Sequence, residues 1–105
     1  MLLYNGEIMD YKFNEDKALE FIKEYIDKTY EQHYASGNIQ ATEFIFDSEH
    51  GEGFCIGNIL KYAQRYGKKE GHNPADILKV IHYAIMLYGK QHTLVLDGEE
   101  YGDKS

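Results

Sequence analysis

Two stretches of the sequence carry side chains whose types and spacing could do chemistry on an anion. In each stretch, polar residues recur at positions i, i+3 and i+7, which places three side chains on one stripe of a helix. The first stripe lies within residues 54–69, FCIGNILKYAQRYGKK, and consists of Asn58, Lys61 and Arg65. The second stripe consists of Asp76, Lys79 and Tyr83.

A seven-residue loop, GKKEGHN, joins the two predicted helices, so we expect an antiparallel helical hairpin whose polar stripes face each other across a cleft. In such a cleft, an arginine holds a phosphate with two parallel N–H groups and a lysine adds a point charge. Asp76 could orient a cation or act as a base, Asn58 could read a base edge, and Tyr62 could stack on a nucleobase. The same spacing also fits a ladder of ion pairs between two solvated helix faces.

The cations of the chain are concentrated in this region. Residues 54–90 carry six Lys and Arg side chains against two acidic ones, although the whole chain has a net charge of −7. Binding of a long polyanion requires cations clustered over an extended surface. We therefore expect a small anionic ligand and no extended nucleic acid.

Several established nucleotide and metal motifs are absent from the sequence. There is no Gly-x-x-x-x-Gly-Lys-Ser/Thr loop, which excludes a P-loop fold, and no cysteine pair for zinc. The single cysteine, Cys55, lies in an apolar stretch and is predicted to be a buried, inert thiol. Four carboxylates could offer oxygen ligands to magnesium, but their spacing does not define a site. They are Glu43, Asp47, Glu49 and Glu52.

The elements that position these residues are predicted to be mainly helical. Apolar residues recur at helical spacing, and Asn14 and Asn73 are candidate N-caps. Pro74 suits the first position of a helix, and Gly67 suits the residue just after one. The expected helices span residues 15–32, 54–66 and 74–88. Residues 39–47 could form a short helix or a strand, and we favour the helix because Ile39, Glu43 and Phe46 would share one side of it.

We expect a single domain over residues 1–105: a mainly α fold with an antiparallel helical hairpin, additional helices and a small N-terminal β-hairpin. Residues 1–13 contain the dipeptide Asn-Gly, which favours a tight type I′ turn. A lone hairpin is marginal, so residues 92–97 are its expected partner. Residues 98–105 are predicted to form a flexible acidic tail.

The N-terminus has no signal-peptide pattern, and no stretch reaches the roughly 18 apolar residues of a membrane span. We therefore expect a cytoplasmic protein. A chain of 105 residues buries only a small core, which favours a homo-oligomer.

The central part of the chain resembles a family of small phage proteins that are labelled as proteins of unknown function, SaV-like proteins or nucleotide kinases. The resemblance covers residues 33–88 and is carried by His33-Tyr34, Gly37, Ile39-Gln40, Glu43-Phe44-Ile45, Phe54, Gly57-Asn58, Lys61-Tyr62, Arg65, Gly67-Lys68-Lys69, Asp76, Lys79 and Tyr83. Its most specific element is the pattern F-x-x-G-N-x-x-K-Y-x-x-R-x-G-x-K. One member of that family is a deoxynucleoside monophosphate kinase without a P-loop.

The resemblance implies that the chain handles nucleotides in a core at residues 33–88. The implied nucleotide-binding residues are His33, Tyr34, Asn58, Lys61, Tyr62, Arg65, Lys68, Lys69, Lys79 and Tyr83. For a nucleoside monophosphate kinase, the implied cofactors are ATP and Mg²⁺, and the implied catalytic residues are Asp76, Lys61 and Arg65. The alternatives are a non-catalytic sponge that sequesters a nucleotide signal of host immunity, as an anti-defence protein, and a regulator that binds a host protein.

Overall fold

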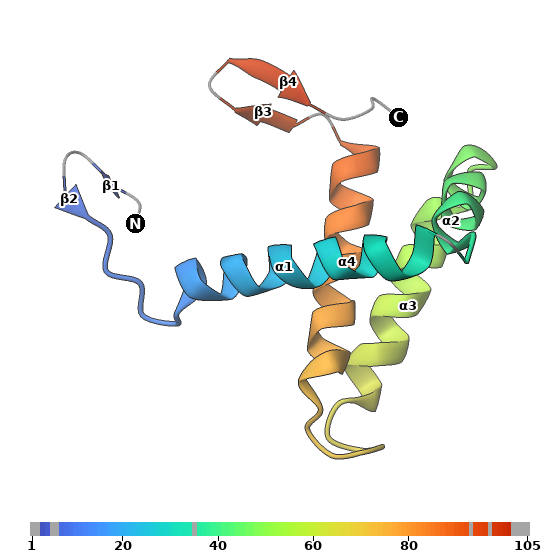
Figure 1. Ribbon diagram of the computed structural model, residues 1–105, viewed down its shortest axis with the longest axis horizontal. Coiled ribbons are helices and arrows are strands. Elements are labelled where there is room, and N and C mark those ends of the chain that lie inside the picture. Colours follow the sequence, from blue (N-terminus) through green and yellow to red (C-terminus); the bar gives the residue numbers. More distant parts are fainter. Residues whose placement is uncertain (1–2, 5–6, 35, 93, 97, 102–105) are drawn as a thin grey trace.

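The structure is a computed structural model that describes the backbone of residues 3–4, 7–34, 36–92, 94–96 and 98–101. The molecule is mainly helical, as predicted from the spacing of its apolar residues (Figure 1). Within the described residues there are four helices. They are α1 (Glu15–Tyr34), α2 (Asn38–Asp47), α3 (Gly51–Arg65) and α4 (Pro74–Gln91).

Helices α3 and α4 form the antiparallel hairpin that the sequence predicts (Figure 1). Side chains join the two helices at both ends. Arg65 meets Asp76 beside the connecting loop, and the amide of Gln91 donates to the Glu52 carboxylate at the opposite end, at 3.2 Å. These two contacts hold α3 and α4 together at both ends of the hairpin.

The residues predicted to end α3 and to begin α4 do so in the loop between the two helices. Gly67 follows α3 with φ 85°, a left-handed conformation that glycine adopts without steric cost. Asn73 caps α4, since its side-chain oxygen accepts from the backbone N–H of Ala75 at 2.9 Å, and Pro74 occupies the first turn. The predicted ends differ from the observed ones elsewhere: α3 already begins at Gly51, and α4 continues through Gly89 to Gln91.

Helix α1 crosses the hairpin in front of α4, and α2 connects the end of α1 to the start of α3 (Figure 1). The segment 39–47 is helical, as expected. Helix α2 packs against α3 where the ring of Phe46 lies against Gly51 and occupies the space that a β-carbon would need. A glycine at this position therefore allows the two helices to approach closely.

Two antiparallel strand pairs flank the helices: β1 (Leu3–Tyr4) with β2 (Glu7–Ile8), and β3 (Leu94–Leu96) with β4 (Glu99–Tyr101). Residues 5–6, which hold the predicted Asn-Gly turn between β1 and β2, lie outside the described residues, so the type I′ turn stays a prediction. The expected pairing of residues 92–97 with it is wrong, because β3 pairs with β4 in a separate sheet. The segment predicted as a flexible tail contains β4, and residues 102–105 lie outside the described part.

The core is small and sits between α3 and α4. Among the described residues, Cys55 and Asp76 are the only side chains in the buried class. Burial raises the pKa of the Cys55 thiol, which agrees with the prediction of an unreactive cysteine. None of the helices, over the residues that the structure describes, combines the length and apolar character needed to cross a membrane.

Candidate functional site

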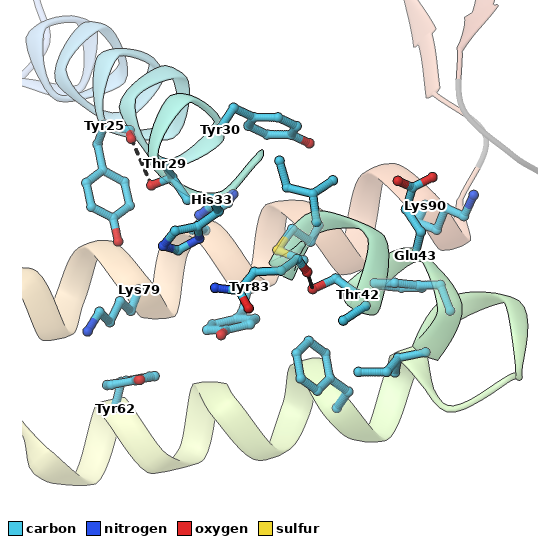
Figure 2. A pocket seen from close by; sticks show the side chains of 18 residues that line it. Tyr25, Thr29, Tyr30, His33, Thr42, Glu43, Tyr62, Lys79, Tyr83 and Lys90 are labelled. Carbon is cyan, nitrogen blue, oxygen red and sulfur yellow. Dashed lines mark hydrogen bonds between the residues drawn. The ribbon is translucent and has the colours of Figure 1, made fainter. Parts of the chain in front are cut away.

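The four helices enclose a pocket of about 600 Å³ on the side of the hairpin that α1 crosses (Figure 2). This volume lies within the range of about 300–1,000 Å³ that small-molecule sites occupy. Every helix contributes to the wall. The polar and aromatic lining residues include Tyr25, Thr29 and His33 of α1, Thr42 and Glu43 of α2, Phe54 and Tyr62 of α3, and Lys79, His82 and Tyr83 of α4.

Aromatic rings make up much of the wall between α3 and α4. The rings of Tyr62 and Tyr83 are nearly parallel, with an interplanar angle of 9° and centroids 6.3 Å apart. Phe54 meets Tyr83 edge-on at 5.6 Å. On the α1 side, Tyr25 meets His82 edge-on at 6.0 Å. These contacts fix the ring orientations and leave a wall on which a planar group can stack.

A lysine stands at one end of this aromatic wall. The ammonium of Lys79 lies 4.8 Å from the centroid of the Tyr62 ring, and the two side chains approach each other below α1 in Figure 2. Within the part of the chain that the structure describes, no salt bridge joins Lys79 to a carboxylate. The ring holds the ammonium without neutralising it, so its charge can attract an anionic ligand.

Two titratable groups in the wall are held in their neutral forms near pH 7. Burial raises the pKa of Tyr83, with smaller contributions from Tyr62, Cys55 and Tyr25. Burial also lowers the pKa of His82 below its ordinary value of 6.5, and the neighbouring His33 lowers it further. The wall therefore presents a neutral phenol and a neutral imidazole, both of which can donate or accept hydrogen bonds.

Arg65 and Asp76 meet as the sequence predicts, but they do so outside the pocket wall. The Arg65 Nε lies 3.5 Å from Asp76 Oδ1, and its Nη2 lies 3.7 Å from Glu70 Oε2. The Asp76 side chain is only 4% exposed, so here the two polar stripes pack against each other directly. The pair ties the loop end of the hairpin together. The open space that the sequence places between α3 and α4 lies instead between the hairpin and helices α1 and α2.

The remaining predicted residues divide between the pocket and the surface. His33, Tyr62, Lys79 and Tyr83 line the pocket. The amide of Asn58 donates to the carbonyl of Phe54 at 2.8 Å, within its own helix, and Lys61 lies with its ammonium 5.0 Å from the Tyr62 ring without lining the pocket. Lys68 and Lys69 are exposed in the loop after α3. The side chain of Tyr34 lies outside the described residues.

Sequence reasoning missed several residues of the wall, chiefly Tyr25, Thr29, Phe54 and His82. Tyr25 recurs with apolar residues at helical spacing, as a core residue would, and His82 has no second ligand at metal-binding spacing. One signal was available: His82 lies three residues after Lys79 and beside Tyr83, which places it on the same side of α4.

The carboxylates considered as magnesium ligands are not gathered into a site. Over the described residues, no group of three or more His, Cys, Asp or Glu side chains is arranged to hold a metal ion. Of the four carboxylates Glu43, Asp47, Glu49 and Glu52, Glu43 lines the pocket and the other three do not.

Comparison with known proteins matches the chain to a protein family. No curated protein and no solved structure matches the chain. A family of proteins of unknown function, designated DUF3310, matches residues 28–85. The matched segment contains the end of α1, all of α2 and α3, and most of α4, so it includes part or all of each helix that lines the pocket. The lining residues Tyr25, Met86 and Lys90 lie outside it. Because this match spans more than half of the sequence, the chain belongs to the DUF3310 family.

Proposed function

We propose that this protein binds one small nucleotide in the pocket between α1, α2 and the α3–α4 hairpin. The observation that carries the proposal is the position of Lys79 at the end of an aromatic wall, 4.8 Å from the Tyr62 ring, in a pocket of about 600 Å³. A nucleotide has an anionic group and a planar base, and this arrangement offers a separate partner to each. From the resemblance to small phage proteins, we also propose that a phage encodes this protein.

In the bound state, the phosphate would lie at Lys79 and the base against the rings of Tyr62 and Tyr83. Lysine attracts phosphate as a point charge, and the wall shields that charge from part of the solvent. Stacking of a base on an aromatic ring is worth about 1–3 kcal/mol and tolerates different bases. His82 and Tyr83, both neutral near pH 7, can hydrogen bond to a sugar or base without repelling the phosphate.

The pocket volume favours sequestration of a single nucleotide over phosphoryl transfer within one chain. A kinase must hold an acceptor and ATP together, with Mg²⁺ between their phosphates. A volume of about 600 Å³ suits one ligand of this class. The second candidate is a nucleoside monophosphate kinase-like phosphotransferase, in which a second chain would have to supply the remaining room.

Calorimetric titration tests nucleotide binding directly, with a panel of nucleoside monophosphates and cyclic nucleotides as probes. We expect Lys79→Ala and Tyr62→Leu each to weaken binding by roughly fivefold or more, since each removes an interaction of about 1–3 kcal/mol. The matched control is Lys68→Ala, which removes an exposed lysine of the loop outside the pocket. Absence of binding to every probe, or equal losses in Lys68→Ala and Lys79→Ala, would contradict the proposal.

A second measurement separates the two candidates. The protein is incubated with deoxynucleoside monophosphates, ATP and Mg²⁺, and the products are separated by ion-exchange chromatography. Formation of nucleoside diphosphates that is lost in Lys79→Ala would establish the kinase. Binding without turnover would leave the sequestering protein.

A further inference from the structure

The α3–α4 hairpin has an apolar face on the side opposite the pocket, which we call the back face. Successive residues of an α-helix are separated by about 100°, so a residue two positions away points to nearly the opposite side. Ile56 and Leu60 are each two positions from the pocket-lining residues Phe54 and Tyr62. On α4, Ile81 and Ile85 are related in the same way to Lys79 and Tyr83. The back face consists of Ile56, Leu60, Ile77, Ile81, Ile85 and Tyr88.

The back face is exposed to an unusual degree for such side chains. Leu60 is 63% exposed and Tyr88 is 60% exposed, and Ile56, Ile77 and Ile85 are also exposed. Within the described residues, the pocket side of the hairpin is covered by α1 and α2, whereas these apolar side chains of the back face are left in contact with solvent. Contiguous apolar surface of this kind is typical of a protein–protein interface.

The exposed surface area and the radius of gyration of the whole chain are both larger than those of a compact monomer. The chain exposes 8349 Å², whereas a compact monomer of 12.2 kDa exposes roughly 6,100 Å². The excess of about 2,200 Å² is larger than the roughly 800 Å² that each partner buries in an interface of standard size. The radius of gyration, 16.0 Å, likewise exceeds the value of about 13 Å for a compact domain of 100 residues. A stable dimer can therefore be built from surface that this chain already exposes.

We propose that a second copy of this chain packs on the back face, so that two α3–α4 hairpins form a four-helix bundle. A two-fold axis brings the same face of each copy together, which requires the face to be complementary to itself. None of its six side chains is charged, so the two copies meet here without like-charge contacts. Elsewhere the net charge of −7 opposes association. Helical hairpins with an apolar face are the standard components of such bundles.

This arrangement leaves both pockets open, because each lies on the outer side of its own hairpin. The proposal does not depend on which ligand the pocket takes. Disruption of the dimer should lower nucleotide affinity by less than twofold where binding is observed, and the dimer should form whether or not a nucleotide binds.

Size-exclusion chromatography with light scattering tests the back face. We expect the full chain to elute with about twice its mass of 12.2 kDa, and Leu60→Lys to elute as a monomer because it places two ammonium groups in the apolar interface. The matched control is Leu19→Lys, which replaces a leucine on α1 that is 61% exposed. The control should remain dimeric. Circular dichroism establishes that each variant is helical, and Tyr88→Ser replaces Leu60→Lys if the latter fails to fold.

Three outcomes would overturn the proposal. A wild-type monomer at a concentration of about 100 μM would exclude a stable dimer. Dimers in both Leu60→Lys and Tyr88→Ser would place the interface elsewhere. Loss of the dimer in Leu19→Lys with its retention in Leu60→Lys would assign the interface to α1.

Discussion

At the scale of single residues, a side chain's role depends on its neighbours, so two residues of the same type can have different roles. Lys79 lies at the pocket with its charge held over a ring, whereas Lys68 is exposed in a loop. Arg65, the residue best suited to hold a phosphate by two hydrogen bonds, is instead paired with the buried carboxylate of Asp76. The residue types were informative about anion chemistry, but their partners decided which of them could take part.

The lowered pKa of His82 predicts a pH-dependent stability. Burial and the nearby His33 disfavour the charged imidazole in the folded state, whereas the unfolded chain retains the ordinary pKa of about 6.5. Below that value the unfolded state binds more protons, so the free energy of unfolding should fall as the pH drops from 6.5 through the lowered pKa. The rings of Tyr25 of α1 and Tyr83 of α4 also lie against this imidazole.

Urea unfolding at about pH 7.5 and about pH 5.5 measures this effect. We expect His82→Gln to reduce the loss of stability between the two pH values, whereas His50→Gln, which replaces an exposed histidine, leaves it unchanged. An equal pH dependence in the wild type and His82→Gln would show that His82 does not cause it.

At the scale of the helices, local chemistry predicts the elements well and their ends less well. Apolar periodicity identified the helices, and Asn73, Pro74 and Gly67 marked the loop between α3 and α4 correctly. The start of α3 at Gly51 was missed because residues 47–53 are polar and contain two glycines, a composition typical of a loop. The ring of Phe46 packs against Gly51 at the start of this helix, a contact that composition alone does not reveal.

The Asn73 cap gives a prediction that belongs to α4 alone. Asn73→Ala removes the acceptor for the Ala75 N–H and should lower the free energy of unfolding by about 1 kcal/mol. The conservative variant Asn73→Ser keeps an acceptor at this position and should recover most of the loss. In urea unfolding, we expect the midpoint to fall in Asn73→Ala while the slope stays constant. Equal stability of the alanine and serine variants would contradict a capping role.

At the scale of the whole molecule, the candidate site could be predicted only in part. The hairpin follows from a short loop between two helices, and it brings together Tyr62, Lys79 and Tyr83. The crossing of α1 over the hairpin is set by packing between residues far apart in the sequence, such as Tyr25 and His82. No local pattern encodes that crossing, so the wall contributed by α1 and the true position of the open space could not be deduced.

The same scale carries the last prediction, which concerns how folding depends on protein concentration. With so few buried side chains among the residues that the structure describes, a single chain has little apolar burial to offset the loss of conformational entropy on folding. If two chains share the back face, association stabilises the folded state by mass action, and each tenfold rise in concentration adds about 1.4 kcal/mol per dimer. For a domain of this size, such an increment should raise the melting temperature by several degrees.

Calorimetric scans at about 1, 10 and 100 μM measure this shift. The variant Leu60→Lys should be monomeric throughout, so it should melt at one temperature that is lower than the wild-type value. A wild-type melting temperature that is independent of concentration would show that each chain folds alone, and the exposed face would then have no part in stability.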